Sequence, residues 1–180
     1  MALFTATDAD ELYYIVRRHY AALGGALGST PAADPPDTAS PLYRDIQLLI
    51  DVANGVHTRS DALVAHTEQA LLRVRGLLLA NALGAPAALS EAFWQTRPGW
   101  LLSRASWWVW MDDLITISNA AALAFGANTQ ANRMRIARAI DSGALDWVPD
   151  PSVSNRQHNR RVRRSQVEWL AEMRQLPGSD

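Results

Sequence analysis

Apolar residues recur at a spacing of three or four positions through most of this chain, and clusters of glycine and proline interrupt the pattern. Such spacing places apolar side chains on one face of a helix, so we expect a mainly α-helical protein. The first helix is capped within residues 7–10 and ends at Gly24 and Gly25; its inward positions are Leu12, Ile15, Val16, His19 and Leu23. Residues 24–41 contain three glycines and four prolines. They predict a linker or a long ordered loop.

Two more helices are expected before residue 84. One begins at Leu42 and ends near Gly55, and the next begins at Ser60 and stops before Gly84 and Pro86. A tryptophan-rich helix is expected across residues 100–114, with Trp100, Trp107, Trp108 and Trp110. We expect two or three of these indoles in the core. The alternative is an exposed aromatic surface for self-association or for a partner protein.

The composition excludes several classes of protein. An apolar content of 48% with 19% charged residues is normal for a folded domain. Cysteine is absent, which excludes disulfides, thiolate catalysis and the common cysteine-containing zinc sites. The acidic amino terminus, MALFTATDADELYY, has no uninterrupted apolar stretch, so we expect neither a signal peptide nor a membrane span. A soluble cytoplasmic protein is the resulting expectation.

Positive charge is concentrated in the last third of the chain, although the formal net charge is only −1. Residues 1–112 contain 8 arginines and 11 acidic residues, whereas residues 128–165 contain 8 arginines and 3 acidic residues. Five of these arginines lie within residues 156–164. Such a cluster is typical either of a polyanion-binding surface or of a solvated hairpin.

The last third also has a distinctive order of local signals. Thr116 can cap a short alanine-rich helix that ends at the turn of Gly126. Asn128 or Asn132 can cap a second helix that runs to Ser142 and is closed by Gly143. In that helix Ile136 and Ile140 face inward, and Arg135 and Arg138 lie on the opposite side.

A small hairpin and a final helix complete the pattern. Residues 145–148 predict a strand, residues 149–159 a polar turn, and residues 161–163 a return strand, so that the hairpin has a cationic tip. Ser165 and Glu168 have the spacing of a capping box and predict the start of the last helix.

Three segments in this order carry a resemblance to a known family: TISNAA (116–121), IDSGAL (140–145) and RVRRSQVEWL (161–170). Residues 114–175 resemble the winged helix-turn-helix of the MerR and phage-excisionase type. The resemblance implies that residues 113–180 form a winged helix-turn-helix with a small β-hairpin wing. It does not extend to residues 1–112, which we expect from their helical spacing and tryptophan content to form a separate helical module for oligomerisation or partner binding.

The resemblance also implies which residues contact duplex DNA. The second helix would enter the major groove with Asn132, Arg133, Arg135 and Arg138. The wing and its flanks would neutralise phosphates with Arg156, Arg160, Arg161, Arg163 and Arg164. The alternative is that these arginines pair with acidic neighbours, namely Asp146, Asp150, Glu168 and Glu172.

No catalytic or metal-binding pattern is found. The histidines are scattered, at positions 19, 57, 66 and 158, without the spacing of a metal site. His57, Ser60 and Asp61 are close in sequence, but nothing resembles a nucleophile elbow, and helix capping by Ser60 explains them better. Asp112 and Asp113 are expected to form the polar end of the tryptophan-rich helix. We therefore expect no enzyme, no cofactor and no metal.

The expected function is duplex DNA binding, as a sequence-specific transcriptional regulator or an architectural factor. Small modules of this kind usually act as dimers, and the amino-terminal helices are the expected homodimer contact. One alternative is an adaptor, antitoxin-like or phage-derived, that binds a protein partner and uses its winged domain for autoregulation. Another is an excisionase-like role in which DNA bending carries the specificity.

Overall fold

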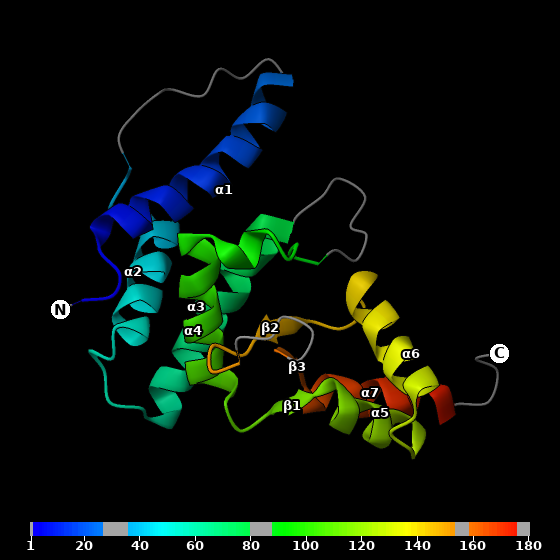
Figure 1. The fold of residues 1–180 in the computed structure, drawn as a ribbon. Coiled ribbons are helices and arrows are strands. Elements are labelled where there is room, and N and C mark those ends of the chain that lie inside the picture. The colour runs from blue at the N-terminus through cyan, green and yellow to red at the C-terminus, as the bar shows by residue number, and fades with distance from the viewer. Residues whose placement is uncertain (1, 27–35, 80–87, 154–158, 176–180) are drawn as a thin grey trace. The chain divides into compact units, whose positions relative to one another are not determined.

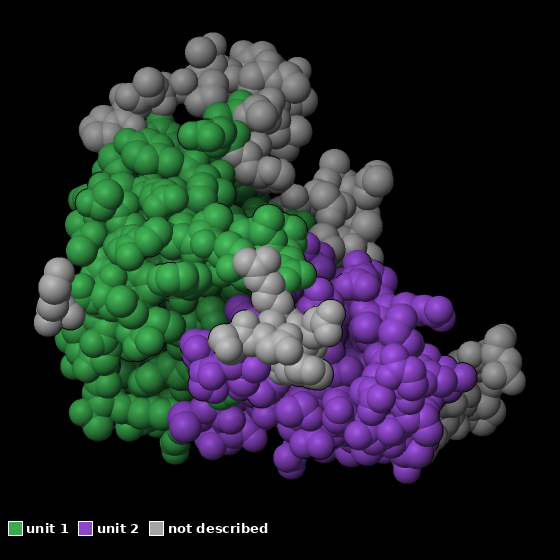
Figure 2. All heavy atoms as spheres, viewed as in Figure 1, with its two compact units in different colours: residues 1–82, 89–109 green, residues 83–88, 110–180 purple. Residues whose placement is uncertain are grey.

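The computed structural model describes residues 2–26, 36–79, 88–153 and 159–175 (Figure 1). These residues form seven α-helices, one short 3-10 helix and three strands, so the protein is mainly helical with a small sheet. The chain divides into two compact units, residues 1–82 with 89–109 and residues 83–88 with 110–180 (Figure 2). No helix in the described ranges has the length and apolar character needed to cross a membrane.

Unit 1 is built from helices whose apolar faces meet. It contains α1 (Ala6–Ala26), α2 (Pro41–Ala53), α3 (Asp61–Leu79), a 3-10 helix (Phe93–Gln95) and most of α4 (Arg97–Trp110). Helix α2 packs against both α1 and α3. The fully buried side chains of these elements form the core of the unit, among them Leu12, Ile46, Leu49, Leu71, Val74, Leu101 and Leu102.

The helix ends of unit 1 follow local chemistry. Ser40 caps α2, because its side chain accepts a hydrogen bond from the Tyr43 amide, and Pro41 occupies the first turn, where no donor is needed. Gly55 follows α2 with a φ of 73°, a left-handed conformation that favours glycine. The two helices that we expected between residues 42 and 84 are confirmed as α2 and α3. Helix α1 continues to Ala26, beyond the predicted end at Gly24, and residues 27–35 of the predicted loop lie outside the described residues.

The tryptophan-rich helix starts earlier than predicted and ends at Trp110. Of its four indoles, Trp110 is buried, Trp107 and Trp108 are partly buried, and Trp100 is 52% exposed. The most deeply buried indole of unit 1 is that of Trp94, in the preceding 3-10 helix, at 2% exposure. We expected two or three of these four indoles in the core, but only that of Trp110 is buried.

In its described residues, unit 2 combines three short helices with a three-stranded sheet. Its elements are β1 (Leu114–Thr116), α5 (Ile117–Phe125), α6 (Gln130–Asp141), β2 (Trp147–Pro149), β3 (Arg160–Arg163) and α7 (Arg164–Gln175). The sheet is antiparallel with the order β1-β3-β2. Val162 at its centre is opposite Ile115 on one side and Trp147 on the other. The antiparallel pairing of β2 with β3 confirms the two strands of the predicted hairpin, whereas residues 154–158 of its turn lie outside the described residues. Strand β1 was not predicted from local signals.

The core of unit 2 depends on small residues in α5. Ala120 and Ala121 are completely buried, and α5 packs against both α6 and α7 (Figure 1). Side chains without a γ carbon allow such helices to approach closely. Ile136 and Ile140 of α6 are also buried, as the periodicity predicts. Val162 and Val167 complete the core from the sheet and α7.

Candidate nucleic-acid interface

A short turn holds α5 and α6 in position. Thr116 caps α5 as predicted, accepting a hydrogen bond from the Asn119 amide at 3.1 Å. Gly126 ends the helix with a φ of 76°. The predicted cap of α6 is wrong. Thr129 is the N-cap and accepts from the Asn132 amide at 3.2 Å.

Asn132 is partly exposed, and its side chain bonds to the turn between α5 and α6. Its side-chain amide donates to the Ala127 carbonyl at 2.8 Å. Its side-chain oxygen accepts a long hydrogen bond, 3.4 Å, from Arg135 Nη1. Asn132 therefore has local structural roles, whereas the resemblance implied a position in the major groove.

Helix α6 presents three faces. Ile136 and Ile140 form the buried face. Arg135 and Arg138, three positions apart, lie on an exposed face, as predicted. The third face carries the four residues at helical spacing that line a hollow: Gln130, Arg133, Met134 and Ala137.

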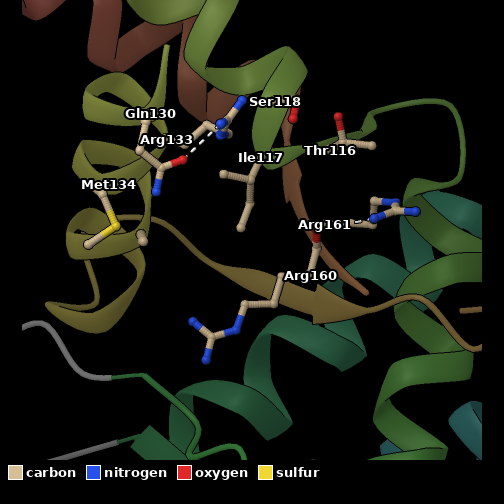
Figure 3. A pocket seen from close by; sticks show the side chains of 9 residues that line it. Thr116, Ile117, Ser118, Gln130, Arg133, Met134, Arg160 and Arg161 are labelled. Atoms are coloured by element: carbon tan, nitrogen blue, oxygen red, sulfur yellow. Dashed lines mark hydrogen bonds between the residues drawn. The ribbon is translucent and has the colours of Figure 1, made fainter. Parts of the chain in front are cut away.

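The hollow has a volume of about 840 Å³ and is lined by residues of β1, α5, α6 and β3 in unit 2 (Figure 3). Besides α6, the start of α5 contributes Ile117 and Ser118 after Thr116, and β3 contributes Arg160 and Arg161. Ile117 lies between the Arg133 and Arg160 side chains in this view, and the Arg161 side chain points away from them. The hollow thus has a mixed lining, with guanidinium groups, hydroxyl groups and an apolar wall.

The guanidinium groups of Arg133 and Arg160 both contact neighbouring side chains. Arg133 donates to Asn128 Oδ1 at 2.9 Å and to Gln130 Oε1 at 2.8 Å, two neutral acceptors that leave its charge uncompensated. Arg160 lies over the Trp147 ring at 4.8 Å. Its Nη1 is 3.4 Å from the exposed carboxylate of Asp141. Preorganised guanidinium groups lose little conformational entropy when they bind an anion.

Arg161 does not project as a free cation. Its guanidinium donates to Asp150 Oδ2 at 2.7 Å, and the two side chains are only 13% and 8% exposed. Asp150 also accepts hydrogen bonds from the amide and hydroxyl of Ser152. The pairing alternative is therefore confirmed for Arg161 with Asp150. The resemblance implied that Arg161 neutralises a phosphate. This geometry does not favour that role, because Asp150 already compensates the Arg161 charge and both side chains are largely buried.

Arg163 is likewise involved in the structure of the unit. It lies over the Trp110 ring at 4.6 Å and 3.3 Å from Asp113 Oδ2. Asp113 also accepts from the amide and the hydroxyl of Ser165, at 3.1 and 2.7 Å. Its carboxylate therefore caps α7 from a distant point in the sequence. The predicted Ser165–Glu168 capping box is wrong, because Ser165 lies inside α7 and its hydroxyl donates to Asp113.

Three of the predicted arginines are exposed in unit 2: Arg135, Arg138 and Arg164. Arg135 lies over the Phe125 ring at 5.3 Å. Arg156, at the predicted tip of the wing, lies outside the described residues. The predicted arginines therefore have different surroundings. Some are exposed, some line the hollow, and some form ion pairs, including two that also line the hollow.

Sequence reasoning missed the polar lining of the hollow. Gln130 and Ser118 were not singled out, although Gln130 stands three positions before Arg133 on the same face of α6. That spacing was the available signal. The contribution of Ser118 depends on how α5 lies relative to α6, which no local pattern contains.

The histidines and acidic residues give no alternative site. In the described part of the chain, no three histidine or acidic side chains are grouped as a metal site requires. His57 Nε2 is 3.9 Å from Asp51, and both side chains are well exposed. Ser60 accepts a long hydrogen bond from the Leu63 amide, which agrees with its predicted capping role.

Comparisons of the chain with protein-family models, curated proteins and solved structures found no match. A function must therefore be argued from the geometry of the chain itself.

Proposed function

We propose that residues 110–175 form a winged helix-turn-helix that binds duplex DNA, with α6 as the recognition helix. The observation that carries the proposal is the exposed arginine face of α6 beside a hollow that also carries arginine. The chain order β1-α5-α6-β2-β3 puts two short helices joined by a turn before an antiparallel pair of strands, and this order supports the proposal.

The chemistry of α6 suits the major groove, which is wide enough to admit a helix. Arg135 and Arg138 are exposed, and a guanidinium can bind the O6 and N7 atoms of guanine with two hydrogen bonds. Helix α6 has 12 residues and presents these side chains from adjacent turns. Exposed arginines also release counterions from the phosphates, so affinity should fall steeply as salt rises.

The strand arginines have a different role in this proposal. Arg161 and Arg163 stabilise the sheet and the start of α7 through Asp150 and Asp113. Replacing them would disturb the fold as well as any interface. They are therefore poor probes of DNA binding, and exposed residues give a cleaner test.

Fluorescence anisotropy with labelled duplex DNA over a salt series tests the proposal. The double variant R135Q/R138Q should lose affinity by about tenfold or more at each salt concentration, because a bidentate arginine–guanine contact contributes about 1–3 kcal/mol. The matched control is R44Q, an exposed arginine on α2 of unit 1. It should bind as the wild type does.

Two results contradict the proposal. One is a wild-type chain that binds no duplex even at low salt. The other is an equal loss of affinity in R44Q and in R135Q/R138Q, which would indicate a non-specific charge effect. Circular dichroism of each variant confirms that the loss does not come from unfolding.

We further propose that the biological role is regulation of transcription or DNA architecture by a homodimer. A single recognition helix reads few base pairs, and two copies related by a two-fold axis read two half-sites. A duplex with inverted half-sites about one helical turn apart should then bind more tightly than a duplex with one half-site.

A further inference from the structure

The hollow of unit 2 does not suit a single phosphate. It has a volume of about 840 Å³, and Ile117, Met134 and Ala137 supply an apolar wall. A site for one phosphate needs only donors that converge on one point. The lining therefore points to a longer ligand with both charged and apolar parts.

Two guanidinium groups reach the hollow from different elements. Arg133 comes from α6, and Arg160 comes from β3. Figure 3 shows Ile117 between them in this view. Arg133 is fixed by Asn128 and Gln130, and Arg160 by the Trp147 ring and Asp141. A lining that combines two cations with apolar side chains suits a phosphate–sugar–phosphate stretch of one nucleic-acid strand.

We infer that one strand of the bound duplex passes through this hollow, with successive phosphates at Arg133 and Arg160 and the intervening sugar against Ile117 and Met134. This inference rests on the proposed function and deepens it. It divides α6 into two roles. The face of Arg133 contacts the backbone and is insensitive to sequence, whereas the face of Arg135 and Arg138 contacts base edges.

The division differs from the expectation that the resemblance gives for Arg133. Gln130, Arg133, Met134 and Ala137 share one face at helical spacing, and that face borders the hollow. Arg135 and Arg138 do not line it. The two sets of side chains lie on different faces of α6, so they should have different effects on affinity and on sequence preference.

The salt dependence of binding distinguishes the two roles. Each phosphate neutralised contributes about 0.9 to the slope of log affinity against log salt. R133Q and R160Q should each lower the magnitude of this slope by about 0.9, and R133Q/R160Q by about 1.8. The loss should be the same on an A·T-rich and on a G·C-rich duplex of equal length. R138Q, the matched variant on the other face, should instead change the ratio of the two affinities.

A second pair of variants, at Met134, leaves the contact between Arg160 and Trp147 in place. Met134 is 46% exposed, so a polar residue is tolerated there. M134E places a carboxylate in the hollow and should repel the strand, whereas M134Q, of nearly the same shape, should bind almost as the wild type does. The difference between these two variants should shrink at high salt, because screening weakens the repulsion.

The outcomes separate the two proposals. Failure of the wild-type chain to bind either duplex overturns the proposed function and this inference together. Binding by the wild type, with an unchanged slope in R133Q/R160Q and equal affinities for M134E and M134Q, overturns only the inference. A loss in R133Q/R160Q that is confined to one duplex also overturns it, because the hollow would then read bases.

Discussion

Arg161 and Arg138 have the same charge in the sequence but different surroundings in unit 2. Arg161 is closed into a buried ion pair with Asp150, whereas Arg138 is exposed on α6. The charge cluster was evident from composition, and the exposed arginines of α6 followed from helical periodicity. Which arginines pair depends on contacts between residues distant in sequence, so the pattern alone left both alternatives open.

A residue-scale prediction concerns the buried Asp8 of unit 1. Its carboxylate accepts from Arg97 Nε at 2.8 Å and Nη2 at 3.0 Å, and also from the amide and hydroxyl of Thr5. The hydrogen bonds from Arg97 lower the pKa of Asp8, and burial opposes them in part. The folded state therefore has the lower pKa, and this stabilisation is present above the ordinary carboxyl pKa and lost as pH falls through the folded value.

Urea unfolding between neutral and acidic pH measures this effect. The wild type should lose more unfolding free energy on acidification than D8N, whose amide does not titrate. At neutral pH D8N should be the less stable of the two, because it leaves Arg97 without its carboxylate. If the unfolding free energies of the two proteins changed with pH by the same amount, Asp8 would not be the cause of the pH dependence.

At the scale of elements, the sequence predicted what is encoded locally. The helix ends at Gly55, Gly126 and Gly143 were predicted correctly, because glycine is favoured wherever the backbone adopts a left-handed conformation. The hairpin of β2 and β3 followed from alternation and turn residues. Strand β1 and the cap of α7 were missed, since both depend on pairing between segments distant in sequence.

The cap of α7 gives an element-scale prediction. Asp113 accepts two hydrogen bonds from Ser165 and lies beside Arg163. D113A should lower the unfolding free energy by about 1–2 kcal/mol, the usual cost of losing a helix cap. S165A removes only the hydroxyl donor and should cost less. A ranking with S165A more destabilising than D113A, measured by urea unfolding, would contradict the role of Asp113.

At the scale of the whole molecule, unit 1 has a surface that suits the proposed homodimer. Its described helices expose a large aromatic side chain at Trp100, 52% exposed, on the same helix as the partly buried Trp107 and Trp108. Exposed tryptophan is enriched at the energetic centres of protein interfaces. This supports the proposal that unit 1 forms the homodimer contact, because two copies would supply the two recognition helices that two half-sites require.

The last prediction tests that proposal through Trp100. W100S should raise the dimer dissociation constant by about tenfold or more in analytical ultracentrifugation, because truncation of a central interface tryptophan typically costs about 2 kcal/mol or more. The matched control is V56S, at an apolar residue of unit 1 that is 66% exposed. V56S should leave the dimer intact. If W100S binds a two-site duplex as tightly as the wild type does, dimerisation does not depend on this tryptophan, and the recognition helices are joined by another surface.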